Sequence, residues 1–279
     1  SYGSLGNQMV SEYGYIPTMT SRQGNYVIDG KYAQVVTAPG IVSSDYTWEK
    51  VTTLNGGVDF GFLNNRLTAS IDAYRRDTKG MLTLGKDLPG VLGASEPKEN
   101  AADMKTTGWE LSIAYQDNLQ LAGKPLSWSA KFTLSDNQSW ITRFDNPDKN
   151  LGQYYEGYKM GDIWGLKSDG LFTSKEEIAA LDESTVIPWG ALEIVPGWPK
   201  YKDLNNDGKI TKGTTANEPN DLSVIGNSEE RYRFGVNLNG AWNGLDVSVF
   251  LQGVLKRDYY PLSYLYWGFY QQPYAGGPE

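Results

Sequence analysis

The sequence predicts an all-β fold, namely a transmembrane antiparallel meander β-barrel with long extracellular loops. Three observations predict it. Apolar and polar residues alternate with a period of two in six segments, tight turns alternate with long connections, and 19 Tyr, 9 Trp and 32 Gly accompany only 39% hydrophobic residues. Such alternation is typical of strands with one apolar and one polar face, and this composition favours strands and turns over helical bundles.

The clearest hairpin covers residues 231–258. On its first strand, one face carries Tyr232, Phe234, Val236, Leu238, Gly240 and Trp242, and the other carries Arg233, Gly235, Asn237, Asn239 and Ala241. Asn243 and Gly244 follow, and both tolerate the positive φ that a type I′ turn requires. The return strand carries Leu245, Val247, Val249, Leu251 and Leu255 opposite Asp246, Ser248 and Gln252.

Two further hairpins have the same pattern. One covers residues 48–76 with a turn at Asn64 and Asn65, and the other covers residues 109–135 with a turn within 118–125. With the end of another strand at residues 1–5, the chain is expected to hold six full strands and part of a seventh.

The connections between hairpins are long, at residues 8–45, 80–108, 145–230 and 258–279. Alternation of short turns with long loops is typical of outer-membrane barrels, and a compact soluble domain rarely has four such loops at one edge. The alternative is a soluble calcium-binding β-sandwich that binds carbohydrate, because its strands also have one wet face.

The two predicted faces differ in side-chain type. The apolar face has aromatic residues towards strand ends, as interfacial girdles do: Tyr46, Trp48, Trp109, Trp128, Tyr232 and Trp242. The polar face, which suits either a hydrated lumen or the wet side of a soluble sheet, holds Asp59, Asp72, Glu110, Lys131, Arg233 and Asp246.

Composition excludes several function classes. The chain has no Cys and no His, so it cannot form a disulfide, a thiolate or imidazole zinc site, or a Ser-His-Asp triad. No pair of carboxylates is grouped as at a hydrolytic site, so the sequence predicts no enzyme and no catalytic residue. The net charge of −8, without a basic stripe, argues against nucleic acid as a partner.

The loop at 145–230 contains two local motifs. Ser174 to Glu177 is a capping box that predicts a short helix. Further on, Asp203, Asn205 and Asp207 stand at the first, third and fifth positions of an EF-hand-type loop.

In that second motif Gly208 permits the sharp turn and the Lys209 carbonyl is the candidate seventh-position ligand. Thr214 occupies the twelfth position, where an acid is usual, so Asp221 is the candidate that closes the shell. The spacing favours Ca²⁺ in the 203–221 loop, with Na⁺ or Mg²⁺ and a metal-free Asx-rich turn as alternatives. Any ion here would hold the loop in place and would not drive chemistry.

Several motifs in order resemble SusC-like TonB-dependent transporters. Residues 38–50 resemble their "P-x-[LIV]-x-W-E-[KT]" strand entry, with Pro39 and Trp48 to Lys50 matching. Residues 161–172 are similar to "W-G-x-x-x-D-G-[IL]-F", residues 201–227 to "Y-x-D-x-N-x-D-G-x-I … V-I-G-N", and residues 250–253 to "F-x-Q-G".

The resemblance implies a barrel of roughly 22 strands around an N-terminal plug in the bacterial outer membrane, surrounded by membrane lipid. It also implies energy from the TonB complex, a SusD-like surface lipoprotein as lid, and an oligosaccharide or peptide as substrate. Residues 1–279 would be a later part of the barrel domain, without the plug and the barrel termini. A receptor for a metal chelate or a vitamin is the alternative function. The sequence identifies no substrate-binding residue.

If the tight turns are periplasmic, all four long connections lie outside the cell. We then expect the connections at 145–230 and 258–279 to contact the lid.

Overall fold

The computed structural model describes residues 1–7, 16–43, 47–84, 91, 96–181 and 194–260. It separates into two compact units, residues 1–159 with 234–252, and residues 160–233 with 253–279. Each unit is described by itself below.

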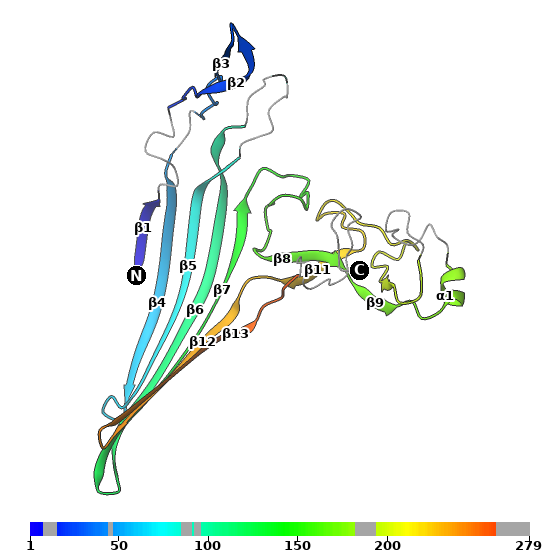
Figure 1. The fold of residues 1–279 in the computed structure, drawn as a ribbon. Coiled ribbons are helices and arrows are strands. Elements are labelled where there is room, and N and C mark those ends of the chain that lie inside the picture. Colours follow the sequence, from blue (N-terminus) through cyan, green and yellow to red (C-terminus); the bar gives the residue numbers. More distant parts are fainter. Residues whose placement is uncertain (8–15, 44–46, 85–90, 92–95, 182–193, 261–279) are drawn as a thin grey trace. The chain divides into compact units, whose positions relative to one another are not determined.

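The first unit is dominated by a seven-stranded sheet in the order β1-β4-β5-β6-β7-β12-β13 (Figure 1). Its strands are β1 (Tyr2–Asn7), β4 (Glu49–Phe62), β5 (Leu67–Leu84), β6 (Lys98–Leu121), β7 (Lys124–Arg143), β12 (Arg231–Trp242) and β13 (Leu245–Lys256). This is the predicted meander, and β1 and β13 lie at the two edges of the sheet. The first unit also holds a separate hairpin, β2 (Ser21–Ile28) with β3 (Lys31–Val36).

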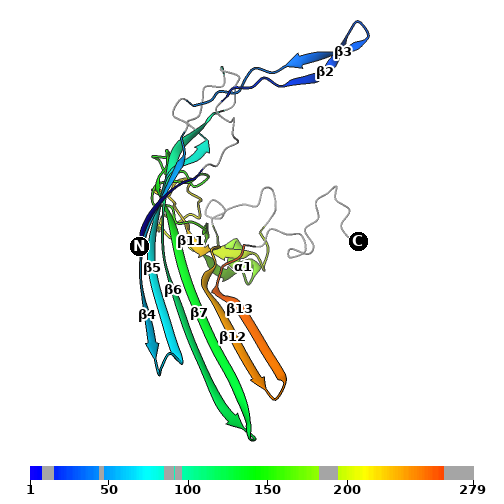
Figure 2. The same cartoon turned by 90° about the vertical axis from the view of Figure 1, so that its left-hand side faces the viewer.

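Three tight turns lie together at one end of the sheet (Figures 1 and 2). The predicted turns at Asn64-Asn65 and Asn243-Gly244 are confirmed, and all four residues have positive φ. The predicted turn at 118–125 is too wide, because Leu121 already pairs with Lys124 and only Ala122 and Gly123 connect the strands.

The predicted loop at 80–108 is also too wide, because β5 continues to Leu84 and β6 begins at Lys98. The pairing of β5 with β6 shifts register between Thr78 and Met81 and again between Met81 and Thr83. Gly80, with φ of 68°, lies within the first irregularity. A bulge breaks the period of two without ending the strand, so the sequence pattern resembled a loop there.

The second unit contains two short antiparallel pairs, β8 (Asp162–Leu166) with β11 (Leu222–Asn227) and β9 (Ser168–Leu171) with β10 (Pro199–Tyr201). The predicted helix is α1 (Lys175–Ala179), and its N-cap Ser174 accepts a hydrogen bond from the Glu177 amide. Among the described helices, none is long and apolar enough to cross a membrane.

The large sheet leaves its apolar face open. Val58, Ile71 and Val247 are 52%, 47% and 52% exposed. In a sandwich these side chains would be covered by a second sheet. The sandwich alternative is therefore wrong, and the exposed apolar surface needs a non-aqueous environment.

Candidate functional site

The apolar side chains form straight rows across the sheet. Val58 pairs with Ile71, which pairs with Leu111, which pairs with Leu134. The next row on the same face is Phe60, Ala69, Ile113 and Phe132. Because strand partners share a face, four neighbouring strands present one continuous apolar band.

Aromatic side chains border this band. Towards the tight turns, the Tyr115 and Trp128 ring centroids lie 5.2 Å apart and the Trp242 indole N–H donates to the Leu121 carbonyl at 3.1 Å. On β6, Asp117 is the strand partner of Trp128. Trp109 precedes Asp117 by eight residues, and this separation is about 26 Å along the strand at ~3.3 Å per residue. Because barrel strands tilt by about 35–45° from the membrane normal, this length spans roughly 20 Å of depth, which fits within the lipid-facing band of about 25 Å in outer-membrane barrels. The predicted girdle residue Tyr46 lies outside the described residues.

The opposite face is polar, as predicted for Asp59, Asp72, Glu110 and Lys131. Asp72 and Glu110 are direct strand partners there, and Asp59 pairs with Ser70. Like charges directly opposite are unfavourable in a packed interface, so this face needs water or polar partners. The sheet therefore separates an apolar face from a hydrated one.

Arg233 does not extend this pattern clearly. Tyr232, the residue before Arg233, has φ of 55°, which interrupts the alternation, and the Arg233 guanidinium forms an ion pair with Glu230 at 3.0 Å.

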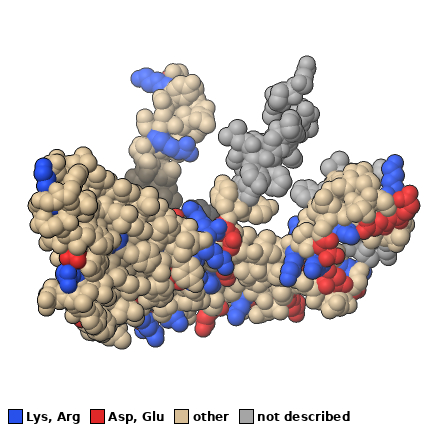
Figure 3. All heavy atoms as spheres, turned by 90° about the horizontal axis from the view of Figure 1, so that it is seen from below, with Lys and Arg blue, Asp and Glu red and all other residues tan. Residues whose placement is uncertain are grey.

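Seen from the turn end, much of the surface carries no charged residue (Figure 3).

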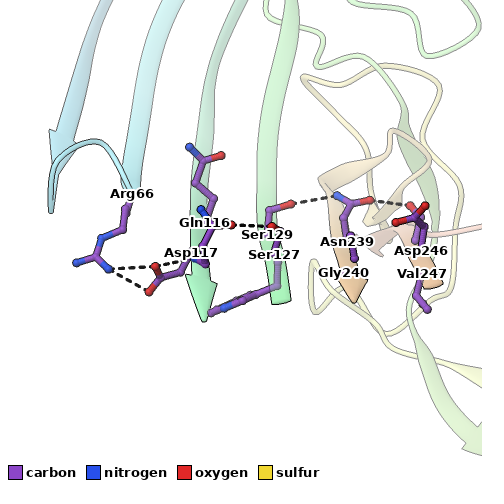
Figure 4. Close-up of a pocket in the computed structure, with 13 residues that line it drawn as sticks. Arg66, Gln116, Asp117, Ser127, Ser129, Asn239, Gly240, Asp246 and Val247 are labelled. Atoms are coloured by element: carbon purple, nitrogen blue, oxygen red, sulfur yellow. Dashed lines mark hydrogen bonds and ion pairs between the residues drawn. The ribbon is translucent and has the colours of Figure 1, made fainter. Parts of the chain in front are cut away.

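A cavity of about 550 Å³, which the sequence did not indicate, lies at the turn end of the sheet (Figure 4). Polar side chains cross the strands around it. The Asn239 amide donates to Ser129 Oγ at 3.3 Å and accepts from the Ser248 hydroxyl at 2.7 Å, while Arg66 contacts Asp117 at 3.1 Å. The predicted polar-face residue Asp246 also lines it.

In the second unit the family-like motifs pair with one another. The Trp164 segment of β8 pairs with the Val224 segment of β11. Asn227, at the end of the "V-I-G-N" match, donates to the Met160 carbonyl at 2.9 Å and to the Asp162 carboxylate at 2.8 Å. Its backbone N–H donates to Asp258 at 2.8 Å. These two motifs therefore build one structural block.

A polar cluster holds the helix α1, which also belongs to the second unit. The Glu177 carboxylate accepts from the Lys200 ammonium at 2.7 Å and from the Thr173 amide at 2.8 Å and hydroxyl at 2.9 Å. The Lys200 contact, with the two Thr173 hydrogen bonds, lowers the pKa of Glu177 to about 2. The ammonium lies 5.9 Å from the centroid of the buried Phe172 ring.

The predicted metal ligands lie in one local turn. Asp203 Oδ2 accepts from the Gly208 amide at 2.8 Å, whereas Asp203 Oδ1 is buried without a hydrogen-bond partner. Asn205 Oδ1 accepts from the Asp207 amide at 3.1 Å, and Asp207 Oδ1 accepts from the Lys209 amide at 2.8 Å.

Asp221 closes this loop by hydrogen bonds to the backbone. Its carboxylate is fully buried and accepts from the Leu204 amide at 2.7 Å and the Thr211 amide at 2.6 Å. No group of three or more acidic side chains positioned for a metal occurs in the described part of the chain. An ion there would depend on the Asn205 amide and backbone oxygens as well as on carboxylates.

Comparison with known proteins agrees with this geometry. The family model described as "TonB dependent receptor-like, beta-barrel" matches residues 2–276. The chain is 23% identical to TonB-dependent receptor P3 of Formosa agariphila over 90% of its length and 25% of that protein. It is 29% identical to TonB-dependent receptor SusC of Bacteroides thetaiotaomicron over 55% of its length and 15% of that protein.

Solved structures share the fold. The chain is similar to the RagAB peptide transporter, with a TM-score of 0.61 at 22% identity, over 90% of this chain and 25% of that one. The RagAB importer in its open-open state gives a TM-score of 0.63 at 21% identity, over 89% of this chain and 24% of that one. The chain spans about a quarter of the length of P3 and of these transporter chains. With an apolar band on one face, a polar wall on the other and a family model covering nearly every residue, the chain belongs to the TonB-dependent receptor β-barrel family.

Proposed function

We propose that this chain supplies wall strands and outer loops to a transporter that imports an oligosaccharide or a peptide across the bacterial outer membrane. The TonB complex would energise it and a SusD-like surface lipoprotein would close its mouth. The two-faced sheet carries the proposal, because one face suits lipid and the other suits a hydrated passage. No bond of the substrate is broken in this function.

The relatives support this class of function. SusC is named a TonB-dependent receptor and RagAB a peptide transporter. The long connections also offer surface to a lid, since Tyr154 in the 145–230 connection and Tyr259 in the 258–279 connection are 46% and 74% exposed. Tyrosine is enriched in protein interfaces, and a stable lid would bury more than about 1,000 Å². Most of the 258–279 connection, from residue 261 onward, lies outside the described residues.

Crosslinking in intact cells tests the proposal. Photoreactive residues replace Tyr154 or Tyr259 in the loops, and Asn64 or Asn243 in the turns, of the full-length protein. We expect adducts with the lipoprotein from the loop positions and none from the turns. Adducts from the turns alone would place the loops in the periplasm and overturn the proposed topology. Uptake of labelled glycan or peptide, with and without TonB, tests transport itself.

A structural Ca²⁺ in the 203–221 loop is part of the proposal. The residues present fit it, because Asp203 Oδ1 is buried and free to accept while its second oxygen is fixed by Gly208. Asp203, Asn205, Asp207 and the Lys209 carbonyl would hold the ion, with Asp221 at the closing end. The ion would order the loop.

A further inference from the structure

One row of residues crosses the polar face of the sheet at the level of Trp109, which borders the apolar band on the opposite face. The row has four members that are successive strand partners: Asn55 of β4, Tyr74 of β5, Gly108 of β6 and Asn137 of β7. Gly108 directly precedes Trp109, so alternation places it on the polar side, and strand partners share a face. These four residues form the Tyr74 row.

The Tyr74 ring lies flat over Gly108. A Cβ atom on Gly108 would lie 2.6 Å from Cζ, 2.6 Å from the hydroxyl oxygen and 2.9 Å from Cε1 of Tyr74. Such similar distances to three adjoining atoms arise when the face of the ring, and not its edge, covers the glycine. Covering a glycine accounts for one ring face only. The other face is turned away from the sheet, and Tyr74 is half-buried.

Carboxamides flank the ring on both sides. Asn55 Oδ1 is buried without a hydrogen-bond partner, which is unfavourable for an acceptor, so this amide has hydrogen-bonding capacity to give to a ligand. Asn137 is half-buried at the other end of the row. With neighbouring strands ~4.8 Å apart, the strands that carry the two amides are about 14 Å apart, with the ring between them.

The two adjacent rows of the polar face are hydrophilic. Towards the tight turns the row is Gly57, Asp72, Glu110 and Ser135, and away from them it is Thr53, Arg76, Thr106 and Ser139. The ring is therefore the one apolar surface within these three rows. Carboxylates, a guanidinium and amides around it can each form paired hydrogen bonds with neighbouring hydroxyl groups of a ligand.

This surround suits a sugar better than a peptide. The strands β4 to β7 are paired on both sides, so their backbone groups are engaged and a peptide cannot add to them as a further strand. The rows also offer no apolar pocket for a peptide side chain. A sugar ring has an apolar C–H face, which the electron-rich face of an aromatic ring attracts, and a rim of hydroxyl groups.

We propose that the Tyr74 row is a subsite for a neutral oligosaccharide on the lumen wall of the barrel. Tyr74 stacks on a sugar ring, and Asn55 and Asn137 form hydrogen bonds with its hydroxyl groups and those of the next unit. The subsite rests on the proposed transport function and names the substrate class. Tyr74 follows Asn65 of the tight turn by nine residues, about 30 Å along β5, which places the row towards the outer mouth.

Charge around the row favours a neutral ligand. Asp72 and Glu110 on one side repel an anionic ligand, and Arg76 on the other side repels a cationic one.

The test uses the full-length transporter, purified in detergent without its lipoprotein. One labelled probe set holds neutral oligosaccharides of glucose, mannose, galactose or xylose, and the other holds uncharged peptides of similar mass. Mass spectrometry identifies the retained probes, and fluorescence titration measures their affinities. The variants are Tyr74→Leu, Tyr74→Phe, Asn55→Ala and Asn137→Ala.

Asn237→Ala is the matched control, because it removes another amide from the polar face. Thr133 contacts the Gly235 carbonyl at 3.4 Å, so Asn237 lies about six residues, or ~20 Å, nearer the tight turns than Asn137.

We expect the unchanged protein to retain at least one of the oligosaccharides. Tyr74→Leu should weaken its binding about tenfold and each Asn→Ala change about fivefold. Tyr74→Phe keeps the ring and should bind within about twofold of the unchanged protein, as should Asn237→Ala. Retention of no oligosaccharide overturns the proposal, and so does unchanged affinity in a folded Tyr74→Leu variant. Retention of peptides alone, weakened by the same changes, assigns the row to a peptide and also overturns it.

Two further measurements separate this result from the transport proposal. Heat-modifiability on gels reports whether each variant still forms a folded barrel, and TonB-dependent uptake of the retained oligosaccharide reports transport. If the unchanged protein imports the oligosaccharide but the folded variants bind it equally well, only the subsite is wrong. If the variants lose binding but the unchanged protein shows no TonB-dependent uptake, the subsite stands and the transport proposal is wrong.

Discussion

Ser112 and Ile113 are neighbours in β6 but lie in rows on opposite faces of the sheet. Ser112 pairs with Ser70 and Thr133, whereas Ile113 pairs with Ala69 and Phe132. One residue step along the chain thus crosses from the polar wall to the apolar band.

Arginine should be tolerated very differently at these two positions. Ile113→Arg would place a charge in the lipid-facing band and should destabilise the barrel by about 2–4 kcal/mol, whereas Ser112→Arg should cost little. The same contrast is expected for Val236 against Asn237, and for Val249 against Ser248. A refolding titration of the complete barrel in lipid measures it. Equal tolerance at both members of each pair would contradict the membrane assignment.

Features that depend on a few neighbouring residues could be predicted from the sequence, whereas features that depend on pairing between distant segments could not. The hairpins at Asn64-Asn65 and Asn243-Gly244 were predicted because turn chemistry and alternation are both local signals. The bulge near Gly80 was missed because it removes the alternation while preserving the pairing. The turn at Ala122-Gly123 was placed only broadly, since Ala122 with φ of 51° gives no sequence signal for positive φ.

The long connection at 145–230 was the least predictable part. The capping helix is local and was found, but the pairing of Trp164 with Val224 joins distant segments that lack alternation. The spacing of Asp203, Asn205 and Asp207 indicated their proximity. This spacing could not show that the Asp221 carboxylate accepts hydrogen bonds from two backbone amides.

Gly108 should not tolerate a larger residue. A Cβ atom at this position would lie 2.6 Å from the Tyr74 ring, which crosses the glycine on the polar face. Gly108→Ala should therefore destabilise the barrel by about 1–3 kcal/mol through overpacking. Adding Tyr74→Ala should recover part of that loss, as urea unfolding of Gly108→Ala, Tyr74→Ala and the double variant would show. Gly240→Ala, where a Cβ meets nothing within 4 Å, is the control.

The Glu177–Lys200 contact should make the α1 segment sensitive to acid. The pKa of Glu177 falls from 4.5 to about 2 in the folded chain. A lowered pKa means that the contact stabilises the segment fully above about pH 4.5 and is lost as the pH falls towards 2. Hydrogen exchange of peptides containing Thr173, corrected for intrinsic rates, should accelerate over this range.

Lys200→Gln should remove most of that pH dependence, because the ammonium is the largest cause of the shift. Lys202→Gln is the matched control, since its ammonium lies 3.7 Å from Asp169 and does not contact Glu177. The same acid response in both variants would show that another group controls the segment.

Asp203 and Asp221 should respond differently to calcium. If Ca²⁺ binds, a chelator should speed proteolysis of the 203–221 loop in the full-length protein, and Asp203→Asn should abolish that response by weakening the ligand. Asp221→Ala should loosen the loop with or without calcium. It removes a fully buried carboxylate that fixes the Leu204 and Thr211 amides, at a local cost of roughly 1.5–3 kcal/mol per hydrogen bond. Equal proteolysis of the unchanged protein in calcium and in chelator would instead favour the metal-free Asx-rich turn, in which Asp203 only accepts from Gly208.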